Sequence, residues 1–326
     1  MKMIFQDLIK PFFVLAPMDD VTDVSFRQMI ASLASPDLFF TEFVNVDGLM
    51  SEGRDRLMVK LKHSKQDKPI IAQLWGSKPD NFKEIALQIK DMGFDGIDLN
   101  MGCPDKTIVK NGCCSALIND RDLAADIIAK TIEGSNGLPV SVKTRVGFNQ
   151  VDLTWFDFLM QFNLSGITVN GRTKKEMSKV PANWDLIAQV VEMRNKKRPD
   201  LLIIGNGDVD SRADGLNKAK TYGVDGIMIG RGVLKDPFVF ATDSPWINYS
   251  PADKIKLFIR HIELFKQNWP NGERKIVQLF KFAKLYINNF DGASELRSEL
   301  MNIKSIEQAL TILNSSLTSF NDLKQG

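Results

Sequence analysis

Histidine and cysteine, which build many catalytic and structural sites, are scarce in this chain. It has two histidines, His63 and His261, and three cysteines, Cys103, Cys113 and Cys114. So few histidines argue against a histidine-based metal site and against a Ser-His-Asp triad, and we expect no bound metal. Three clustered cysteines, two of them adjacent, form no disulfide framework, so a reducing cytoplasm is the expected compartment.

Long apolar runs are also missing. No stretch reaches the roughly 18 apolar residues that a membrane-spanning helix needs. Asp7 and Lys10 interrupt the N-terminal apolar run, so no signal peptide is expected. The 326 residues, 44% of them hydrophobic and 25% charged, suit one large globular domain with a small appendage, and we expect a monomer.

The formal charge of +2 conceals a basic C-terminal part. Residues 251–326 carry eight Lys and three Arg against three Asp and five Glu, a net +3, so the rest of the chain carries −1. A basic tail fits an acidic partner, but a solvated helix surface explains it equally well.

Short apolar runs recur along the first 250 residues, with amphipathic segments between them. Each run is almost continuously apolar, as strands buried on both faces are. Eight strands are expected, at residues 12–17, 37–43, 69–75, 95–100, 139–145, 165–172, 201–208 and 225–232. Amphipathic helices are expected at 82–92, 124–132, 184–193 and 213–222, with Asp120, Asp152 and Asp210 as caps.

Alternating strands and helices predict an α/β fold, a parallel (β/α)8 TIM barrel. A doubly wound open sheet is the alternative, but the glycine-rich loops follow the last two strands instead of the first. Beyond Pro251 only helices are expected, at 252–268, 273–289, 294–300 and 305–320. We therefore divide the chain into a barrel, residues 1–248, and a C-terminal all-helical domain, residues 249–326.

Polar residues sit at the carboxyl ends of most predicted strands, the rim where barrels of this type carry their active sites. The loops at 205–208 and 230–232 offer exposed backbone amides and Arg231, which suits a phosphate, although tight turns alone explain such glycines. Met18 offers an apolar platform, Gln73 an amide, and Lys143 a positive charge unless it extends to solvent. Together these groups fit flavin mononucleotide, FMN.

The loop after the fourth strand carries the most reactive side chain. Gly102 and Pro104 define a tight turn that presents the Cys103 thiol just past a buried strand. An isolated cysteine there is more often simple packing. Beside a hydride-donating cofactor, however, a thiol can supply a proton as a general acid. Without a histidine nearby, we expect this thiol to be mostly protonated at rest.

These residues resemble the flavin-dependent tRNA-dihydrouridine synthase family. The resemblance covers the whole barrel and, less sharply, the C-terminal helices. It includes Asp98-Leu99-Asn100-Met101-Gly102-Cys103-Pro104, of which Asn100 to Pro104 is the most specific part. The other matching segments are Ala16-Pro17-Met18, Val21-Thr22-Asp23, Phe26-Arg27, Glu42, Gln73-Leu74 with Gly76, Val142-Lys143-Thr144-Arg145, Gly171-Arg172-Thr173, Asn206-Gly207-Asp208 and Gly230-Arg231-Gly232.

The resemblance implies that the chain reduces a uridine in tRNA to 5,6-dihydrouridine with FMN and NADPH. It implies a flipped uracil that receives hydride at C6 from the flavin and a proton at C5 from Cys103. FMN would be held by Pro17, Met18, Asp19, Gln73, Lys143, Asn170, Asn206, Gly207, Asp208, Gly230 and Arg231. The uracil or RNA would be held by Asn100, Arg145, Arg172, Lys281, Lys284 and Arg297.

Two positions depart from the family pattern. Asn170 stands where the family usually has His, and an amide cannot carry a charge there. Cys113 and Cys114 stand where the family usually has small residues, as packing or as an oxidation liability. Two other functions stay open: a flavin barrel reductase acting on a small molecule, and a flavin-free RNA-binding relative. The position of the modified uridine stays open, as does the choice between tRNA and ribosomal RNA as the substrate.

Overall fold

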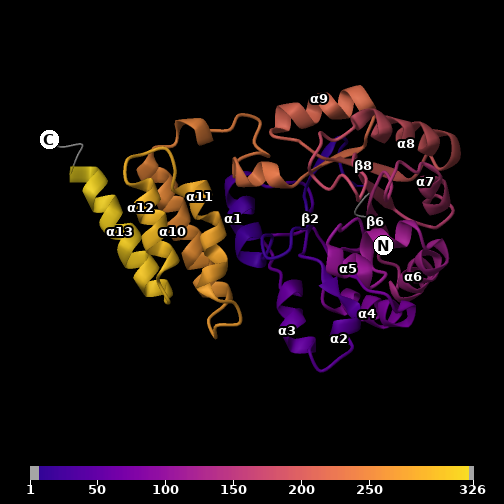
Figure 1. Cartoon of the computed structure of the whole chain (residues 1–326), viewed down its shortest axis with the longest axis horizontal. Coiled ribbons are helices and arrows are strands. Elements are labelled where there is room, and N and C mark those ends of the chain that lie inside the picture. Colours follow the sequence, from indigo (N-terminus) through magenta and orange to yellow (C-terminus); the bar gives the residue numbers. More distant parts are fainter. Residues whose placement is uncertain (1–6, 323–326) are drawn as a thin grey trace.

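The computed structural model describes residues 7–322; the first six residues of the stretch assessed for a signal peptide lie outside this range. Its core is a barrel of parallel strands with helices around it (Figure 1). The strands are β1 (Phe12–Leu15), β2 (Phe39–Phe40), β3 (Val44–Asn45), β4 (Ile70–Trp75), β5 (Gly96–Met101), β6 (Val140–Arg145), β7 (Gly166–Asn170), β8 (Leu202–Asn206) and β9 (Gly226–Ile229).

Neighbouring strands pair in barrel order, β1-β9-β8-β7-β6-β5-β4-β2, and a bridge between Val14 and Leu38 joins the two ends of the sheet. The predicted TIM barrel is therefore confirmed. The predicted strand at 37–43 is wrong in its bounds, because only β2 lies within that range and β3 begins after it, at Val44. Between β2 and β3, the Thr41 hydroxyl accepts a hydrogen bond from the backbone N–H of Gln73 in β4 at 3.1 Å, where a strand would use a backbone carbonyl.

Side chains alternate between the barrel interior and the surrounding helices, as strand geometry requires. One interior cluster is apolar and includes Phe12 and Val14 of β1 and Ile204 of β8, all fully buried. Three neighbouring strands, β4, β5 and β6, also place polar side chains inside the barrel, with Gln73, Asp98 and Ser141 in register side by side. The interior thus has an apolar part and a polar part.

The outer helices match the predicted amphipathic segments and add several short ones. They are α1 (Val24–Ala34), α2 (Val46–Leu49), α3 (Arg54–Met58), η1 (Val59–Leu61), α4 (Pro79–Asp91), α5 (Lys106–Lys110), η2 (Cys114–Ile118), α6 (Arg121–Gly134), α7 (Thr154–Leu159), α8 (Trp184–Lys197), α9 (Arg212–Tyr222), η3 (Arg231–Leu234) and η4 (Trp246–Asn248). Asp120 caps α6 as predicted, but Ser211 instead of Asp210 caps α9, and Asp152 lies one residue before the cap position of α7.

The C-terminal part is helical, as predicted, and lies to one side of the barrel (Figure 1). It consists of α10 (Pro251–Asn268), η5 (Ile276–Phe282), α11 (Ala283–Tyr286), α12 (Ala293–Met301) and α13 (Ile306–Asp322). The single helix predicted at 273–289 is wrong. These residues form the 3-10 helix η5 followed by the short α11 instead, and η5 buries Leu279, Phe280 and Phe282.

The helical part is fixed to the barrel through α1 and the loops after β1 and β2. Phe282 stacks on Phe26 of α1 with ring centroids 4.9 Å apart. The Trp269 indole N–H donates to Asp23 at 3.0 Å, and Arg274 forms a buried ion pair with Glu42. The two parts therefore share a polar and aromatic interface. Within the described residues, no helix is both long and apolar enough to cross a membrane.

Candidate active site

A cavity of about 500 Å³ opens at the carboxyl ends of the strands and brings together most of the residues predicted to hold a cofactor. Gln73 and Asp19 are the predicted cofactor residues that do not line it. The lining residues are Ala16, Pro17, Met18, Lys143, Arg145, Asn170, Arg172, Asn206, Gly207, Asp208, Val209, Asp210, Met228, Gly230, Arg231, Gly232 and Lys235. Residues from six segments of the sequence thus converge at the predicted rim.

Two glycines shape the corner after β8 and β9. Gly207 has a φ of +128°, which L side chains rarely adopt, and a Cβ there would lie 2.6 Å from the Cβ of Ala182. A Cβ on Gly230 would project toward Ala16 and Met18, at 3.5 Å and 3.8 Å. Without those side chains, the backbone of both loops stays open to the cavity, as a phosphate requires.

Positive charge dominates the cavity wall. Asp208 is paired with Arg172 and, at 3.0 Å, with Arg231. Partial burial alone would raise the pKa of Asp208, but the hydrogen bond from Arg172 lowers it below its ordinary value. Arg231 is therefore partly neutralised and less free to bind a phosphate than the sequence suggested.

Lys143 and Arg145 have no carboxylate partner within ion-pair distance among the residues the structure describes. Burial and the nearby Arg145 lower the pKa of Lys143 to about 8, against opposing effects of Asp98 and Cys103. Lys143 therefore places a mostly protonated ammonium group at the cavity at neutral pH. With Arg145, it is an unpaired charge available to an anionic ligand or ring.

Arg145 has a supporting role that the sequence did not reveal. Its Nε donates to the Gly102 carbonyl at 2.7 Å, and another nitrogen donates to the carbonyls of Thr173 and Met177 at 3.1 Å and 3.0 Å. The guanidinium thus holds the turn that precedes Cys103 while it also lines the cavity.

Asn170 occupies the position where the resemblance implied a histidine. Its Nδ2 donates to Asn206 at 2.9 Å, and Asn206 Nδ2 in turn donates to the Met228 carbonyl at 2.8 Å. The Oδ1 of Asn170 is buried and has no hydrogen-bond partner in the structure. Such an acceptor is costly unless a ligand satisfies it. A donor on a bound cofactor fits this atom, so the residues present are compatible with FMN.

The Cys103 turn is held from several sides. Asn100 Oδ1 accepts the N–H groups of Gly102 at 3.1 Å and Cys103 at 3.0 Å. Ser115 Oγ donates to the Cys103 carbonyl at 2.8 Å. The thiol itself is partly exposed. A defined backbone therefore presents one accessible sulfur beside Lys143 and Arg145, whose charges act on it.

The protonation of Cys103 differs from our expectation. A hydrogen bond with the Cys114 thiol lowers the pKa of Cys103 to about 7; burial opposes the shift, and the Asp105 backbone and Lys143 assist it. The lowered pKa runs against our expectation of a mostly protonated thiol, because it brings the thiolate form within reach of neutral pH. Burial raises the pKa of Cys114 well above its ordinary value. All three cysteines are free.

Gln73 and Asp19 lie outside the cavity wall. The fully buried Gln73 amide donates to Asp98 at 2.7 Å and accepts from Asn100 at 3.1 Å. Asp19 is exposed and forms an ion pair with Lys60. The sequence analysis gave Asp98 no role in the site, although its position two residues before Asn100 on one strand places both on the same face.

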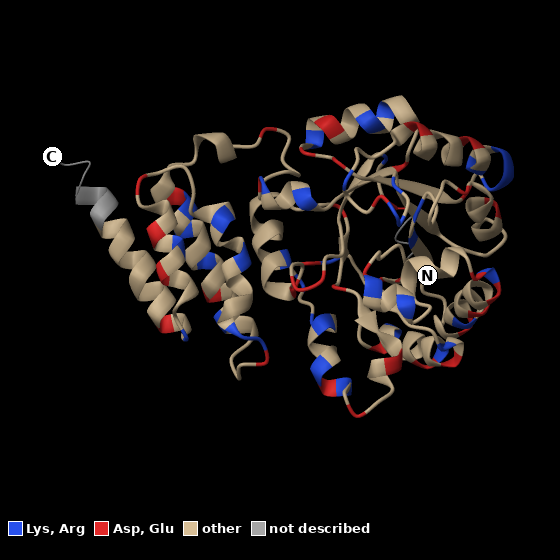
Figure 2. Cartoon of the chain, in the orientation of Figure 1, with Lys and Arg blue, Asp and Glu red and all other residues tan. Residues whose placement is uncertain are grey.

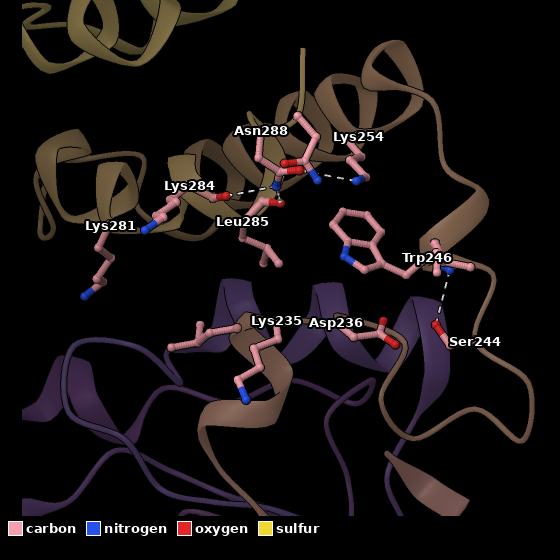
Figure 3. Close-up of a pocket in the computed structure, with 12 residues that line it drawn as sticks. Lys235, Asp236, Ser244, Trp246, Lys254, Lys281, Lys284, Leu285 and Asn288 are labelled. Carbon is pink, nitrogen blue, oxygen red and sulfur yellow. Dashed lines mark hydrogen bonds between the residues drawn. The ribbon is translucent and has the colours of Figure 1, made fainter. Parts of the chain in front are cut away.

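A second cavity, of about 830 Å³, lies between the barrel and the C-terminal helices. Lys281, Lys284 and Lys254 approach it from the helical side and Lys235 from η3, as Figure 3 shows. Lys281 also donates to the Asp20 carbonyl. Arg297, predicted to bind RNA, is not among the lining residues and donates to the Ile287 carbonyl at 2.7 Å.

The charges of the helical part are unevenly placed (Figure 2). The segment 275–286, which contains η5 and α11, carries Lys275, Lys281 and Lys284 and no acidic residue. The acidic residues of this part whose side chains the structure describes lie outside that segment, at Asp253, Glu263, Glu273, Asp291, Glu295, Glu299 and Glu307. Lys235 lines both cavities, so the lysine-lined cleft adjoins the rim cavity.

Comparison with known proteins gives consistent matches. The family model described as "Dihydrouridine synthase (Dus)" matches residues 14–322. A "Probable tRNA-dihydrouridine synthase" of Staphylococcus aureus (strain COL) is 41% identical over 313 residues, covering 95% of this chain and 94% of the relative. "Probable tRNA-dihydrouridine synthase 2" of Bacillus subtilis (strain 168) is 40% identical over 313 residues, covering 95% of each.

Among solved structures, morphinone reductase superposes with a TM-score of 0.52 over 72% of this chain and 86% of that chain. The two sequences are 12% identical, so this likeness shows a shared barrel fold and nothing finer.

Proposed function

The chain belongs to the dihydrouridine synthase family, and on that premise we propose that it reduces a uridine of tRNA to 5,6-dihydrouridine, with bound FMN and NADPH as reductant. The observation that carries the proposal is that the two cavities adjoin, because Lys235 lines both of them. The rim cavity, with the Cys103 turn beside it, meets the lysine-lined cleft at Lys235. A polyanion in the cleft can therefore deliver one base to the rim.

The rim cavity supplies groups suited to FMN. The open backbone at Gly207 and Gly230 accommodates the phosphate, the buried Oδ1 of Asn170 accepts a hydrogen bond, and Lys143 provides positive charge. When bound, FMN supplies the hydride that adds to the uracil C6. Lys143, held with a pKa of about 8, stays charged beside the cofactor at neutral pH.

Cys103 is the proposed general acid. It donates the proton that the adjacent carbon, C5, needs once hydride has been added to C6. A pKa of about 7 is near the operating pH, where a general acid combines a protonated population with ready proton release. Asn100 fixes the turn and keeps one further amide N–H with which to hold the uracil edge.

Residues 249–326 form the proposed RNA-docking domain. The lysines of the cleft would grip tRNA phosphates without reading sequence, so the affinity falls with salt. Lys284→Ala should weaken tRNA binding and reduce the salt slope by about one. Lys220→Ala is the matched control, because Lys220 is exposed on α9 and does not line the cleft. Equal affinities and slopes for the two variants would reject this surface.

The proposal is tested by nucleoside mass spectrometry of tRNA from a strain that lacks this protein. Loss of dihydrouridine at one or a few mapped positions is expected, and unchanged dihydrouridine contradicts the proposal. A small-molecule reductase would leave tRNA unchanged and has no use for the lysine-lined cleft. A flavin-free RNA-binding relative would show no flavin absorbance after purification with FMN.

A further inference from the structure

A continuous chain of hydrogen bonds crosses the polar part of the barrel interior and ends at the Cys103 turn. Ser141 Oγ donates to Asp98 Oδ1 at 2.5 Å, and Gln73 Nε2 donates to Asp98 Oδ2 at 2.7 Å. Asn100 Nδ2 donates to Gln73 Oε1 at 3.1 Å. Asn100 Oδ1 then accepts from the backbone of Gly102 and Cys103. We call Ser141, Asp98, Gln73 and Asn100 the relay.

Every donor in the relay points toward Asp98. An ionised carboxylate accepts only, so Gln73 must present its NH₂ group to Asp98 and its carbonyl oxygen to Asn100. Asn100 must then present its NH₂ group to Gln73, which leaves its oxygen for the turn. Backbone N–H groups donate only, so an Asn100 amide turned the other way would abandon them. The carboxylate at one end therefore fixes which atom faces the turn at the other.

The relay is shielded from water, so water cannot satisfy an amide that is turned the wrong way. Asp98 and Gln73 are fully buried, and Asn100 is only 7% exposed. Burial raises the pKa of Asp98 to about 6, against the opposing bonds from Ser141 and Gln73 and the charge of Lys143. Asp98 therefore stays mostly ionised at neutral pH. A buried pair of facing donors or facing acceptors leaves both groups without a partner, which destabilises that arrangement of the amides.

We propose that Asp98 is a positioning residue: its carboxylate orients the Gln73 and Asn100 amides and so holds the backbone turn that presents the Cys103 thiol. Asp98 does not line the rim cavity and acts only through the two amides. The consequence for uridine reduction rests on the proposed function, but the effect on the thiol needs neither tRNA, NADPH nor flavin.

The decisive test reverses the direction of the relay. In Asn100→Asp, a second carboxylate faces Gln73, whose amide cannot donate to both ends, so one contact brings two acceptors together. Adding Asp98→Asn resolves the conflict. Gln73 then turns to donate to the new carboxylate at position 100 and to accept from the new amide at position 98, whose oxygen still accepts from Ser141. The double variant satisfies every bond that Asn100→Asp breaks.

The readout is the pH profile of Cys103 alkylation by iodoacetamide, followed by mass spectrometry on the purified full-length protein. The parent should show a midpoint near 7. Asn100→Asp should raise the midpoint by about one unit, because the loosened turn moves the sulfur away from Cys114. Asp98→Asn alone should shift it less, since its oxygen can face Gln73 and its NH₂ group can face Ser141.

The double variant should return the midpoint to near 7. Asp98→Asn therefore restores the parental midpoint when Asn100→Asp is present, but gives no such gain in the parent. If Asn100→Asp does not fold, recovery of folded protein in the double variant is the same restoration. Three results overturn the proposal. In the first, the shifts in the midpoint caused by the two changes simply add; in the second, Asn100→Asp leaves the midpoint unshifted; in the third, the double variant has the same midpoint as Asn100→Asp. None of these results depends on dihydrouridine synthesis, so a failure here is separable from a failure of the proposed function.

Discussion

Arg274→Ala should destabilise the protein strongly, and in a pH-dependent way. Arg274 lies in the loop between α10 and η5 and pairs with Glu42 in the loop after β2, and neither side chain has more than 4% of its surface exposed. Burial raises the pKa of Glu42 above its ordinary value, although Arg274 opposes the rise. Removing Arg274 leaves a buried carboxylate that must be protonated to remain in the folded state.

The free energy of protonating Glu42 sets an upper limit on this destabilisation. Protonating, at pH 7, a carboxyl group whose ordinary pKa is 4.5 costs about 1.36 kcal/mol for each of 2.5 units, or about 3.4 kcal/mol. At pH 5 the same step costs about 0.7 kcal/mol. Because the folded-state pKa of this acid is raised, its contribution favours folding at low pH and is lost as pH rises above 4.5. The variant should therefore lose stability from pH 5 to pH 7.

Urea unfolding of the parent and of Arg274→Ala at pH 5, 6 and 7 measures this. At pH 7 we expect Arg274→Ala to lower the free energy of unfolding by about 3 kcal/mol. At pH 5 most of this loss should disappear. Arg274→Ala with Glu42→Gln is the control, because an amide needs no proton, and its loss should not vary with pH. A loss below about 1 kcal/mol, or one equal at all three pH values, refutes the reasoning.

Three further predictions concern the rim cavity. Cys103→Ala should keep bound FMN but lower the rate of uridine reduction at least about 100-fold, since the proton donor is lost; turnover at the parental rate contradicts its role. Lys143→Met should lower flavin content or slow flavin reduction by NADPH, and in the parent the same reduction should slow as pH rises through about 8; normal flavin content and reduction in the variant, or a flat pH profile, contradicts this. Asn170→His should retain FMN at least as well as the parent, measured by flavin absorbance after gel filtration; a variant that sheds FMN counts against the assigned position.

The sequence predicted the barrel well because each barrel strand carries its own signal. A buried parallel strand is apolar on both faces, and the glycines after β8 and β9 lie next to their strands in the chain. Nearly all the residues of the rim cavity could therefore be placed without coordinates. The bounds of the strand at 37–43 could not be predicted, because the Thr41 hydroxyl accepts the Gln73 N–H in place of a backbone carbonyl.

The sequence did not predict which polar groups bond to one another. Gln73 offers an amide that fits a flavin as well as it fits a carboxylate, and only the register of β4, β5 and β6 places Asp98 beside it. Arg274 lies far along the chain from Glu42, and no local pattern links them. The pKa of Cys103 depends on Cys114, which α5 and η2 bring back to the turn.

The central claim is that this protein reduces uridine in tRNA with the Cys103 thiol beside a flavin. The direct measurement incubates the purified, FMN-loaded protein with NADPH and tRNA that lacks dihydrouridine, then quantifies dihydrouridine by nucleoside mass spectrometry. The account predicts dihydrouridine at one or a few positions with the parent and almost none with Cys103→Ala. No dihydrouridine from flavin-loaded protein, or equal amounts from both proteins, would contradict it.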